Sequence, residues 1–186
     1  TLGEVIRLWD IGGEQQGIPD EAELKALLEN VGWQKISLSH GELVFLEETS
    51  LDLGAVGKGI GCDAVSAYLK EKPQVTGALI NLGGSSVMTY GEKPDGSEWN
   101  IAVVDPKDSK GEYLGTVIMK EGEFLSTSGD YKKFFEENGV RYHHIFDPST
   151  GYPAKSGLSA VTVIGKNGLE ADGLSTACFV LGIEKG

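Results

Sequence analysis

The sequence is poor in positive charge and in long hydrophobic runs. Lysine and arginine number 16 against 28 aspartate and glutamate residues, so the formal net charge is -12. This charge repels nucleic acid and anionic membranes, and a nucleotide-sized ligand would need a local basic residue or a metal ion to offset it. No apolar run is long enough to cross a bilayer. We therefore expect no nucleic-acid partner and no membrane span within these residues.

Cysteine is also scarce, and the surroundings of the two cysteines say little about whether the protein resides in an oxidising or a reducing compartment. Cys62 and Cys178 lie among small and apolar residues, the usual surroundings of inert buried thiols. With 186 residues, 40% of them apolar, the chain suits one domain with a sizeable core, which we expect to span residues 1–186. Because the sequence opens on Thr1 without a methionine, signal peptide or lipidation motif, we expect an excised piece of a longer chain.

The most distinctive stretch is DLGAVGKGIGCDAV, residues 52–65. It combines an acid, four glycines around a lysine and a second acid where an apolar strand is expected to lead into a helix. Glycine lets the backbone approach a ligand closely, and a helix that starts there turns free N–H groups toward an anion. These features outline a phosphate site.

Two familiar phosphate motifs do not fit this stretch. A P-loop requires Asp52 to be glycine and Gly59 to be serine or threonine. The dinucleotide fingerprint requires its third glycine at Cys62, and no βαβ repeat follows. A plain glycine-rich turn with Lys58 in solvent is equally compatible with this segment, and Asp63 would then only stabilise the first turn of the helix.

The remaining pattern predicts hairpins and a meander with helices packed on them. A helix is expected after Pro19, with Asp20 as its cap, and a hairpin is expected around the turn at His40. A short helix over Tyr131–Glu137 and a last helix over Leu169–Ile183 follow. Because hairpins outnumber any βαβ unit, we expect an α+β fold with a mostly antiparallel sheet. The further expected strands are 77–82, 87–90, 99–104, 113–119, 124–127, 142–146 and 160–164.

Three polar groups stand out as candidates for chemistry. Asp172 and Thr176 lie one helical turn apart on one face, an arrangement that suits Mg²⁺ when phosphates and water supply its other ligands. On spacing alone, however, helix stabilisation by Asp172 is favoured, with Leu174, Cys178 and Leu181 forming the apolar stripe. The segment 126–130 could hold a phosphate or merely cap the helix expected after it.

The pair His143 and His144 stands at an expected strand end. Alternation along a strand sends adjacent side chains to opposite faces, so only one imidazole can face a given cleft. A lone histidine is more often structural than catalytic, but one that reaches an anion site beside a metal would be a natural general base.

The order of these segments resembles the ApbE family of FAD:protein FMN transferases. The matching motifs are DLGAVGKGIGCD, ALINLGGSSV with GEKPDGSEWNIAVVDP, LSTSGDY, RYHHIFDPSTGYP and ADGLSTACFVLG. The resemblance implies that a divalent metal, normally Mg²⁺, holds the pyrophosphate of FAD. FMN would then pass to a threonine or serine of an acceptor flavoprotein, and AMP would leave.

The resemblance also implies roles for individual residues. Asp172, Thr176 and the backbone carbonyl of Ala55 would bind the metal, and His144 would activate the acceptor hydroxyl. The residues implied to bind FAD are Asp52, Lys58, Asn81, Gly83, Gly84 and Ile145.

Two other outcomes remain open at this point. The site could admit water and act as an Mg²⁺-dependent FAD pyrophosphatase, or the chain could be a flavin-binding module without turnover. The resemblance further implies that this sequence is a fragment that lacks the N-terminal segment and the C-terminal end of the family. It also implies a bacterial protein that, at full length, is extracytoplasmic, either periplasmic or a lipoprotein held by an N-terminal anchor that this sequence lacks.

Overall fold

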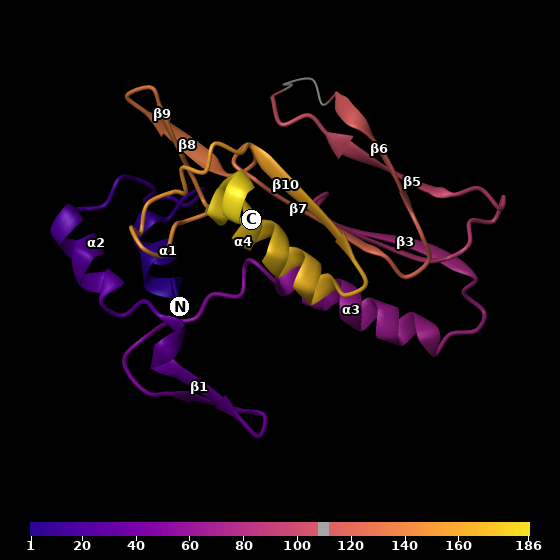
Figure 1. Cartoon of the computed structure of the whole chain (residues 1–186), viewed down its shortest axis with the longest axis horizontal. Coiled ribbons are helices and arrows are strands. Elements are labelled where there is room, and N and C mark those ends of the chain that lie inside the picture. The colour runs from indigo at the N-terminus through magenta and orange to yellow at the C-terminus, as the bar shows by residue number, and fades with distance from the viewer. Residues whose placement is uncertain (108–111) are drawn as a thin grey trace. The chain divides into compact units, whose positions relative to one another are not determined.

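The computed structural model describes residues 1–107 and 112–186, and it confirms the α+β class (Figure 1). The chain divides into two compact units. Unit 1 comprises Thr1–Asp52 and Asp130–Lys155, and unit 2 comprises Leu53–Gly129 and Ser156–Gly186. No helix among the described residues has the length and hydrophobicity of a membrane span.

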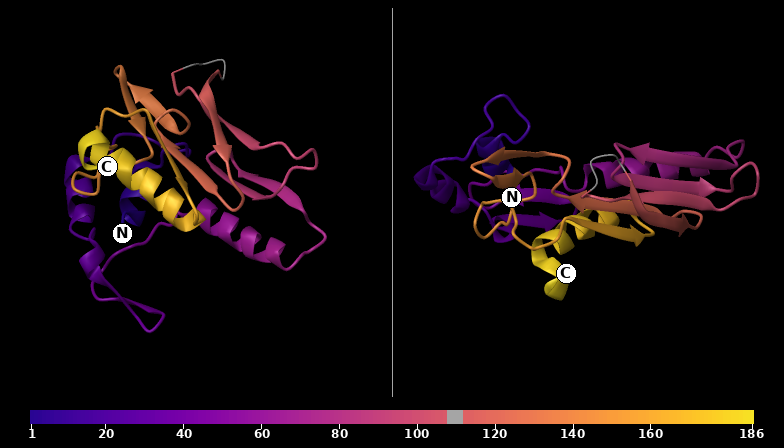
Figure 2. Two further views of the ribbon diagram at one scale, coloured as in Figure 1. Left: turned by 45° about the vertical axis from the view of Figure 1, so that its right-hand side comes forward. Right: turned by 90° about the horizontal axis from the view of Figure 1, so that it is seen from above.

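Unit 2 is built on a four-stranded antiparallel sheet in the order β10-β7-β4-β3. Both long helices, α3 and α4, pack against it, and in both views of Figure 2 α4 runs along β10 and β7. A separate antiparallel hairpin pairs β5 with β6. The elements of unit 2 are α3 (Gly57–Lys70), β3 (Gly77–Leu82), β4 (Ser86–Gly91), β5 (Trp99–Val104), β6 (Tyr113–Met119), β7 (Phe124–Gly129), β10 (Ala160–Gly165) and α4 (Gly168–Lys185).

Alternation along β4 and β7 gives the sheet of unit 2 two apolar faces. Met88 and Phe124 belong to the cluster with Cys62 and Ala171 of the two helices. The neighbouring Val87 and Leu125 belong to a second cluster with Met119 of the β5–β6 hairpin. Successive strand residues point to opposite faces, so helices cover one face and the hairpin covers the other.

Unit 1 is organised around Trp9, which is fully buried. Its indole Nε1 donates a hydrogen bond to the backbone oxygen of Gly151 at 2.9 Å, which satisfies the ring's only polar atom. Val5, Leu24 and Phe146 are buried in the same cluster. The elements of unit 1 are α1 (Gly3–Trp9), α2 (Glu21–Leu28), the 3-10 turn Trp33–Lys35, β1 (Ile36–Ser39), β2 (Glu42–Phe45), β8 (Phe134–Glu137) and β9 (Val140–His143).

Several local predictions for unit 1 are confirmed. Asp20 caps α2 by accepting hydrogen bonds from the N–H groups of Ala22 and Glu23. His40 is the turn residue of the β1–β2 hairpin and has φ 52.

The short helix predicted over Tyr131–Glu137 is wrong. Residues Phe134–Glu137 form β8, which pairs with β9 through a two-residue turn. Asn138 and Gly139 form that turn with φ values of 51 and 75. An Asn-Gly pair adopts positive φ at low cost and favours a tight hairpin, which outweighs the helical propensity of the flanking residues. The strand predicted over 142–146 accordingly ends at His143.

The apolar stripe predicted on the last helix is also wrong. Leu174 and Leu181 are 53% and 51% exposed. The buried face instead carries mostly small or polar residues and one large apolar side chain, Phe179. The buried residues of α4 are Gly168, Ala171, Asp172, Ser175, Phe179 and Gly182. Small side chains let the backbone of α4 approach α3 and the sheet closely, so hydrophobicity alone misjudges which face is buried.

Candidate functional site

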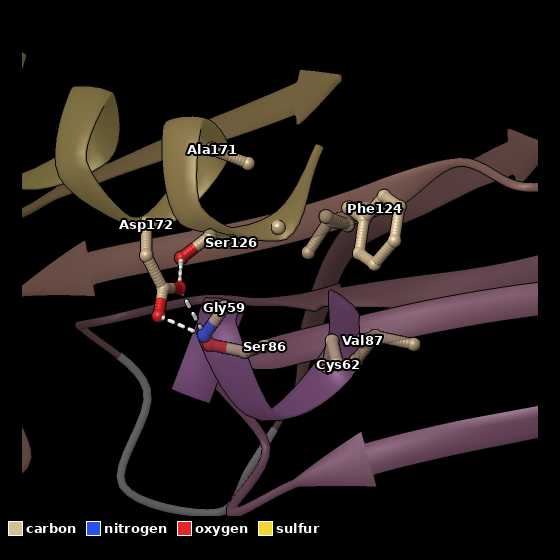
Figure 3. Close-up of a pocket in the computed structure, with 10 residues that line it drawn as sticks. Gly59, Cys62, Ser86, Val87, Phe124, Ser126, Ala171 and Asp172 are labelled. Atoms are coloured by element: carbon tan, nitrogen blue, oxygen red, sulfur yellow. Dashed lines mark hydrogen bonds between the residues drawn. The ribbon is translucent and has the colours of Figure 1, made fainter. Parts of the chain in front are cut away.

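The carboxylate of Asp172 is the centre of a buried polar cluster in unit 2 (Figure 3). Its Oδ2 accepts the backbone N–H of Gly59. Its Oδ1 accepts the hydroxyl of Ser86 at 2.7 Å and also the hydroxyl of Ser126. Asp172 is only 5% exposed, and a buried carboxylate is tolerated only when such donors satisfy it.

A close crossing of two glycines brings the start of α3 against the start of α4. A Cβ added to Gly59 would lie 2.0 Å from the backbone oxygen of Gly168, and one added to Gly168 would lie 2.5 Å from the oxygen of Gly59. No side chain fits at either position without moving backbone. This contact brings the third residue of α3 within hydrogen-bonding reach of Asp172.

A row of hydroxyl groups continues the cluster along α4. Ser126 and Ser128 alternate along β7 and point toward the helix, where Ser128 Oγ lies 2.8 Å from Ser175 Oγ and 2.9 Å from Thr176 Oγ1. Ser126 Oγ lies 3.3 Å from Ser175 Oγ. Asp172 and Thr176 are thereby joined by one hydrogen-bonded network, which their helical spacing alone did not reveal.

Lys58 belongs to the same unit and contacts the β3–β4 turn. Its Nζ donates to Ser85 Oγ at 2.5 Å, so the Lys58 ammonium group has a hydrogen-bond partner in the protein and does not contact water alone. Gly83 and Gly84 form the turn with φ values of 68 and 73, which glycine adopts without strain. The turn is held by Asn81, whose Oδ1 accepts the N–H of Gly84 at 2.7 Å.

Ala55 lies in the turn that immediately precedes α3, where it is exposed. Val56 at the N-cap of α3 makes no side-chain hydrogen bond to the helix, so the first backbone N–H groups of α3 find other partners. The N–H of Gly57 bonds to the oxygen of Leu53, and that of Gly59 is taken by Asp172.

Asp63 caps the start of α4, a role that was not predicted from the sequence. The prediction that it lies in the first turn of its helix is wrong, because α3 begins within the glycine run at Gly57. Asp63 instead accepts the N–H groups of Gly168 and Leu169 at 2.8 and 2.9 Å. It therefore caps α4 from α3.

Three predicted site residues, Asp52, His144 and Ile145, belong to unit 1. Asp52 is exposed and Ile145 is buried. Ile145 donates its backbone N–H to His143 Nδ1 at 3.3 Å. The structure describes these residues within their own unit, and their roles stay predictions.

The two adjacent histidines differ strongly. His143 is buried, and its Nε2 lies 3.1 Å from the backbone oxygen of Ala154 while Nδ1 accepts from Ile145. Burial lowers the pKa of His143 below its usual value of 6.5. His144 is exposed, and its Nδ1 lies 3.1 Å from the backbone oxygen of Lys133. A carbonyl only accepts, so in neutral His144 Nδ1 carries the proton and Nε2 is the basic nitrogen.

Sequence reasoning missed Ser86, Ser175 and the N–H of Gly59 as partners of Asp172. The period-two placement of Ser126 and Ser128 was the available signal, since it puts both hydroxyls on one face of a strand. Cys62 also borders this cluster, and burial raises the pKa of its thiol to about 11. Cys62 is buried, as predicted, and its thiol therefore keeps its proton near neutral pH.

The donor atoms of the cluster suit a hard divalent cation. Among residues 1–107 and 112–186, no three His, Cys, Asp or Glu side chains gather as a metal-binding group. The cluster offers one carboxylate with several hydroxyl oxygens and no sulfur or imidazole. Such a sparse, all-oxygen set fits Mg²⁺, which keeps water and phosphate oxygens as its remaining ligands.

Comparison with known proteins covers the whole chain and agrees with the family resemblance found in the sequence motifs. The family model of the ApbE family matches residues 1–186. The chain belongs to the ApbE family. A Klebsiella pneumoniae protein named FAD:protein FMN transferase is 39% identical over 100% of this chain and 57% of its own length. A Treponema pallidum protein of the same name is 36% identical, over 55% of its own length.

Solved structures of ApbE proteins share the fold. The ApbE protein of Thermotoga maritima superposes with a TM-score of 0.87 at 32% identity, covering 97% of this chain and 58% of that one. The flavinyl transferase ApbE of Pseudomonas stutzeri gives 0.83 at 37% identity, covering 100% and 57%. This chain thus spans little more than half the length of the ApbE proteins that it matches.

Proposed function

We propose that the protein of which this chain forms part transfers FMN from FAD to a threonine or serine hydroxyl of an acceptor flavoprotein. Membership of the ApbE family supports the reaction class, because relatives across the whole chain carry the name FAD:protein FMN transferase. The observation that carries the proposal is the all-oxygen set around Asp172, which lies against the start of α3, where Asp172 accepts the N–H of Gly59. Such a set could hold the divalent metal that assists cleavage of the pyrophosphate bond of FAD.

Asp172, Thr176 and the carbonyl of Ala55 are the proposed holders of Mg²⁺. A carboxylate has about four lone-pair positions, and three of those on Asp172 are occupied by Gly59, Ser86 and Ser126. About one position is left for a cation. When bound, Mg²⁺ neutralises phosphate charge and polarises the phosphorus that is attacked.

The pyrophosphate of FAD is proposed to lie against the start of α3. Helix N-termini favour anions through their N–H groups and the macrodipole, and a cation improves that preference. Lys58 supplies the cation in the first turn of α3. The Gly83–Gly84 turn, which carries no side chains beyond Cα, is proposed to line the same ligand. Asn81 then acts by holding this turn, and Asp52 and Ile145 are proposed as further FAD contacts.

His144 is the proposed general base. Its hydrogen bond to the Lys133 oxygen leaves Nε2 as the basic nitrogen of the neutral ring, and Nε2 would take the proton of the acceptor hydroxyl. The hydroxyl oxygen forms a bond to the FMN phosphorus. The bond from that phosphorus to the oxygen shared with AMP breaks, and AMP leaves. Atoms and charge balance without a further reactant.

Mass spectrometry of an acceptor tests this function. The full-length protein would be incubated with FAD, Mg²⁺ and an acceptor flavoprotein or its target peptide, and both FMN attachment and AMP would be measured. We expect one AMP for each FMN attached and no free FMN. Equal amounts of AMP and free FMN, with no labelled acceptor, would instead indicate an FAD pyrophosphatase. Tight FAD binding with no AMP would indicate a flavin-binding module.

The site of action of the full-length protein is proposed to be extracytoplasmic, at or near the membrane, by resemblance to the family. The strongly acidic chain suits interaction with a protein and a metal–nucleotide complex rather than with nucleic acid. Fractionation of cells that produce the full-length protein, with protease treatment of intact spheroplasts, would test the location. Protection of the protein from that protease would contradict it.

A further inference from the structure

The hydroxyl row beside Asp172 has one consistent direction of hydrogen bonding. Ser175 Oγ donates to the backbone oxygen of Asp172 at 2.9 Å, and a carbonyl oxygen cannot donate in return. A serine hydroxyl has one proton, so Ser175 has none left for Ser128. Ser128 must therefore donate to Ser175 across their 2.8 Å contact.

The same count continues to Thr176. The proton of Ser128 is spent on Ser175, so Ser128 can only accept across its 2.9 Å contact with Thr176. Thr176 is then the donor of that bond. Its hydroxyl proton points toward Ser128, and the lone pairs of Oγ1 point elsewhere. A hydroxyl that donates to the protein while offering its lone pairs is the form that a cation can bind.

The same count of protons and lone pairs applies to the Asp172 carboxylate at the other end of the network. Ser86 and Ser126 both donate to Oδ1 of Asp172, which fills that oxygen's two lone pairs. Gly59 donates to Oδ2 and leaves one lone pair there. The protons of Ser126 and Ser175 are thus both committed to Asp172, although their oxygens lie 3.3 Å apart.

We infer that Ser128 and Ser175 are positioning residues for the proposed metal site, because they orient the Thr176 hydroxyl with its lone pairs available to the cation. The inference rests on the proposed function for the identity of the cation. It adds two residues that act through the Thr176 hydroxyl. Without Ser128, the Thr176 hydroxyl would rotate freely and would lose the proton acceptor that fixes it.

The test measures metal binding and not turnover. Mn²⁺, which is paramagnetic and accepts the same oxygen ligands, would be titrated into the full-length protein with saturating FAD and no acceptor. Unbound Mn²⁺ would be followed by electron paramagnetic resonance. We expect Ser128→Ala to weaken Mn²⁺ binding about 10-fold, the lower end of the usual effect of partners behind a metal ligand.

The chain offers a matched control and a rescue. Thr127, on the opposite face of β7, bonds to Thr162 Oγ1 at 2.9 Å and is outside the network. Thr127→Ala removes a hydroxyl from the same strand and should leave Mn²⁺ binding unchanged. Ser128→Thr keeps the hydroxyl and should restore binding. If Ser128→Ala fails to fold, Ser175→Ala interrupts the same row one step further from Thr176 and should weaken Mn²⁺ binding too.

Thr176→Val and Asp172→Ala separate this inference from the proposed function. Loss of Mn²⁺ binding in both, with wild-type binding in Ser128→Ala, would overturn the inference and leave the metal site standing. Wild-type Mn²⁺ binding in Thr176→Val would overturn the inference by removing Thr176 as a ligand. Wild-type binding in Asp172→Ala, or no binding by the parent, would overturn both the metal site and the inference.

Discussion

Asp63 and Gly168 join the two long helices of unit 2, since the carboxylate on α3 accepts the N–H of the first residue of α4 at 2.8 Å. The second residue of α4, Leu169, donates to the same carboxylate. These two hydrogen bonds hold the start of α4, the helix that carries Asp172 and Thr176, against α3. Position and stability of the site therefore depend on a residue of the glycine-rich segment that touches no ligand in the proposed reaction.

We predict that Asp63→Ala lowers the free energy of unfolding by about 1–2 kcal/mol, the usual cost of losing a helix N-cap. It should also weaken Mn²⁺ binding, because α4 is no longer held to α3. Urea unfolding and the Mn²⁺ titration would measure the two effects. Asn167→Ala removes the cap that α4 carries itself and should affect stability alone. Unchanged stability in Asp63→Ala would contradict the capping role.

Gly59→Ala is predicted to be strongly destabilising. Its Cβ would lie 2.0 Å from the oxygen of Gly168, which is backbone and cannot rotate away. Overpacking of this kind costs about 1–3 kcal/mol or more. Gly57→Ala in the same helix meets nothing within 4 Å and should instead stabilise by up to about 1 kcal/mol. Thermal unfolding of the two variants measures the contrast, and equal melting temperatures would refute the close crossing.

Lys58→Ala is predicted to weaken FAD binding, and the loss should shrink as salt is raised. The proposed role is charge on the phosphates, and mobile ions screen it. Fluorescence titration with FAD at low and high salt measures this effect. Lys70→Ala, at the other end of α3, is the control for removing one positive charge. A loss for Lys58→Ala that does not depend on salt would point to the Ser85 contact instead.

His144→Ala is predicted to slow FMN transfer by about 10²–10⁴-fold, the usual contribution of a general base. FAD and Mn²⁺ binding should stay near the parent values, because the base acts in the chemical step. Single-turnover transfer beside FAD titration measures both. In His143→Gln, transfer should persist, since both ring nitrogens of His143 serve the fold. Normal transfer by His144→Ala would remove it as the base.

Acid is predicted to destabilise the protein through His143. Its pKa is lowered in the folded state by burial, so an unfolded chain takes up this proton first as the pH falls. The stabilisation is fully present above about pH 6.5, the usual histidine value. It is lost as the pH falls toward the lower folded pKa.

Urea unfolding between pH 7.5 and 5 would measure this loss, which amounts to about 1.4 kcal/mol for each unit by which the pKa is lowered. The loss should be smaller in His143→Gln. His40→Gln changes an exposed turn residue and should follow the parent. A parent whose stability is constant over this range would contradict the prediction.

The sequence by itself determined the family and most of the elements. Strong local signals sufficed for the Asp20 cap, the hairpin turn at His40 and the alternating strands, because these structures depend on neighbours in the chain. The motif order identified Asp172, Thr176 and Lys58 as candidates. The Asn138–Gly139 turn was also a local signal, and giving it more weight would have predicted β8 and β9.

Only the tertiary structure decided which groups surround Asp172. Its donors Gly59, Ser86 and Ser126 come from one helix and two strands that the sheet and the helix crossing bring together. The same crossing lets Asp63 of α3 cap the start of α4, and it leaves the leucines of α4 exposed. Hydrophobic periodicity could not reveal this, because the buried face of α4 is selected by close backbone packing and hydrogen bonding between segments far apart in the chain.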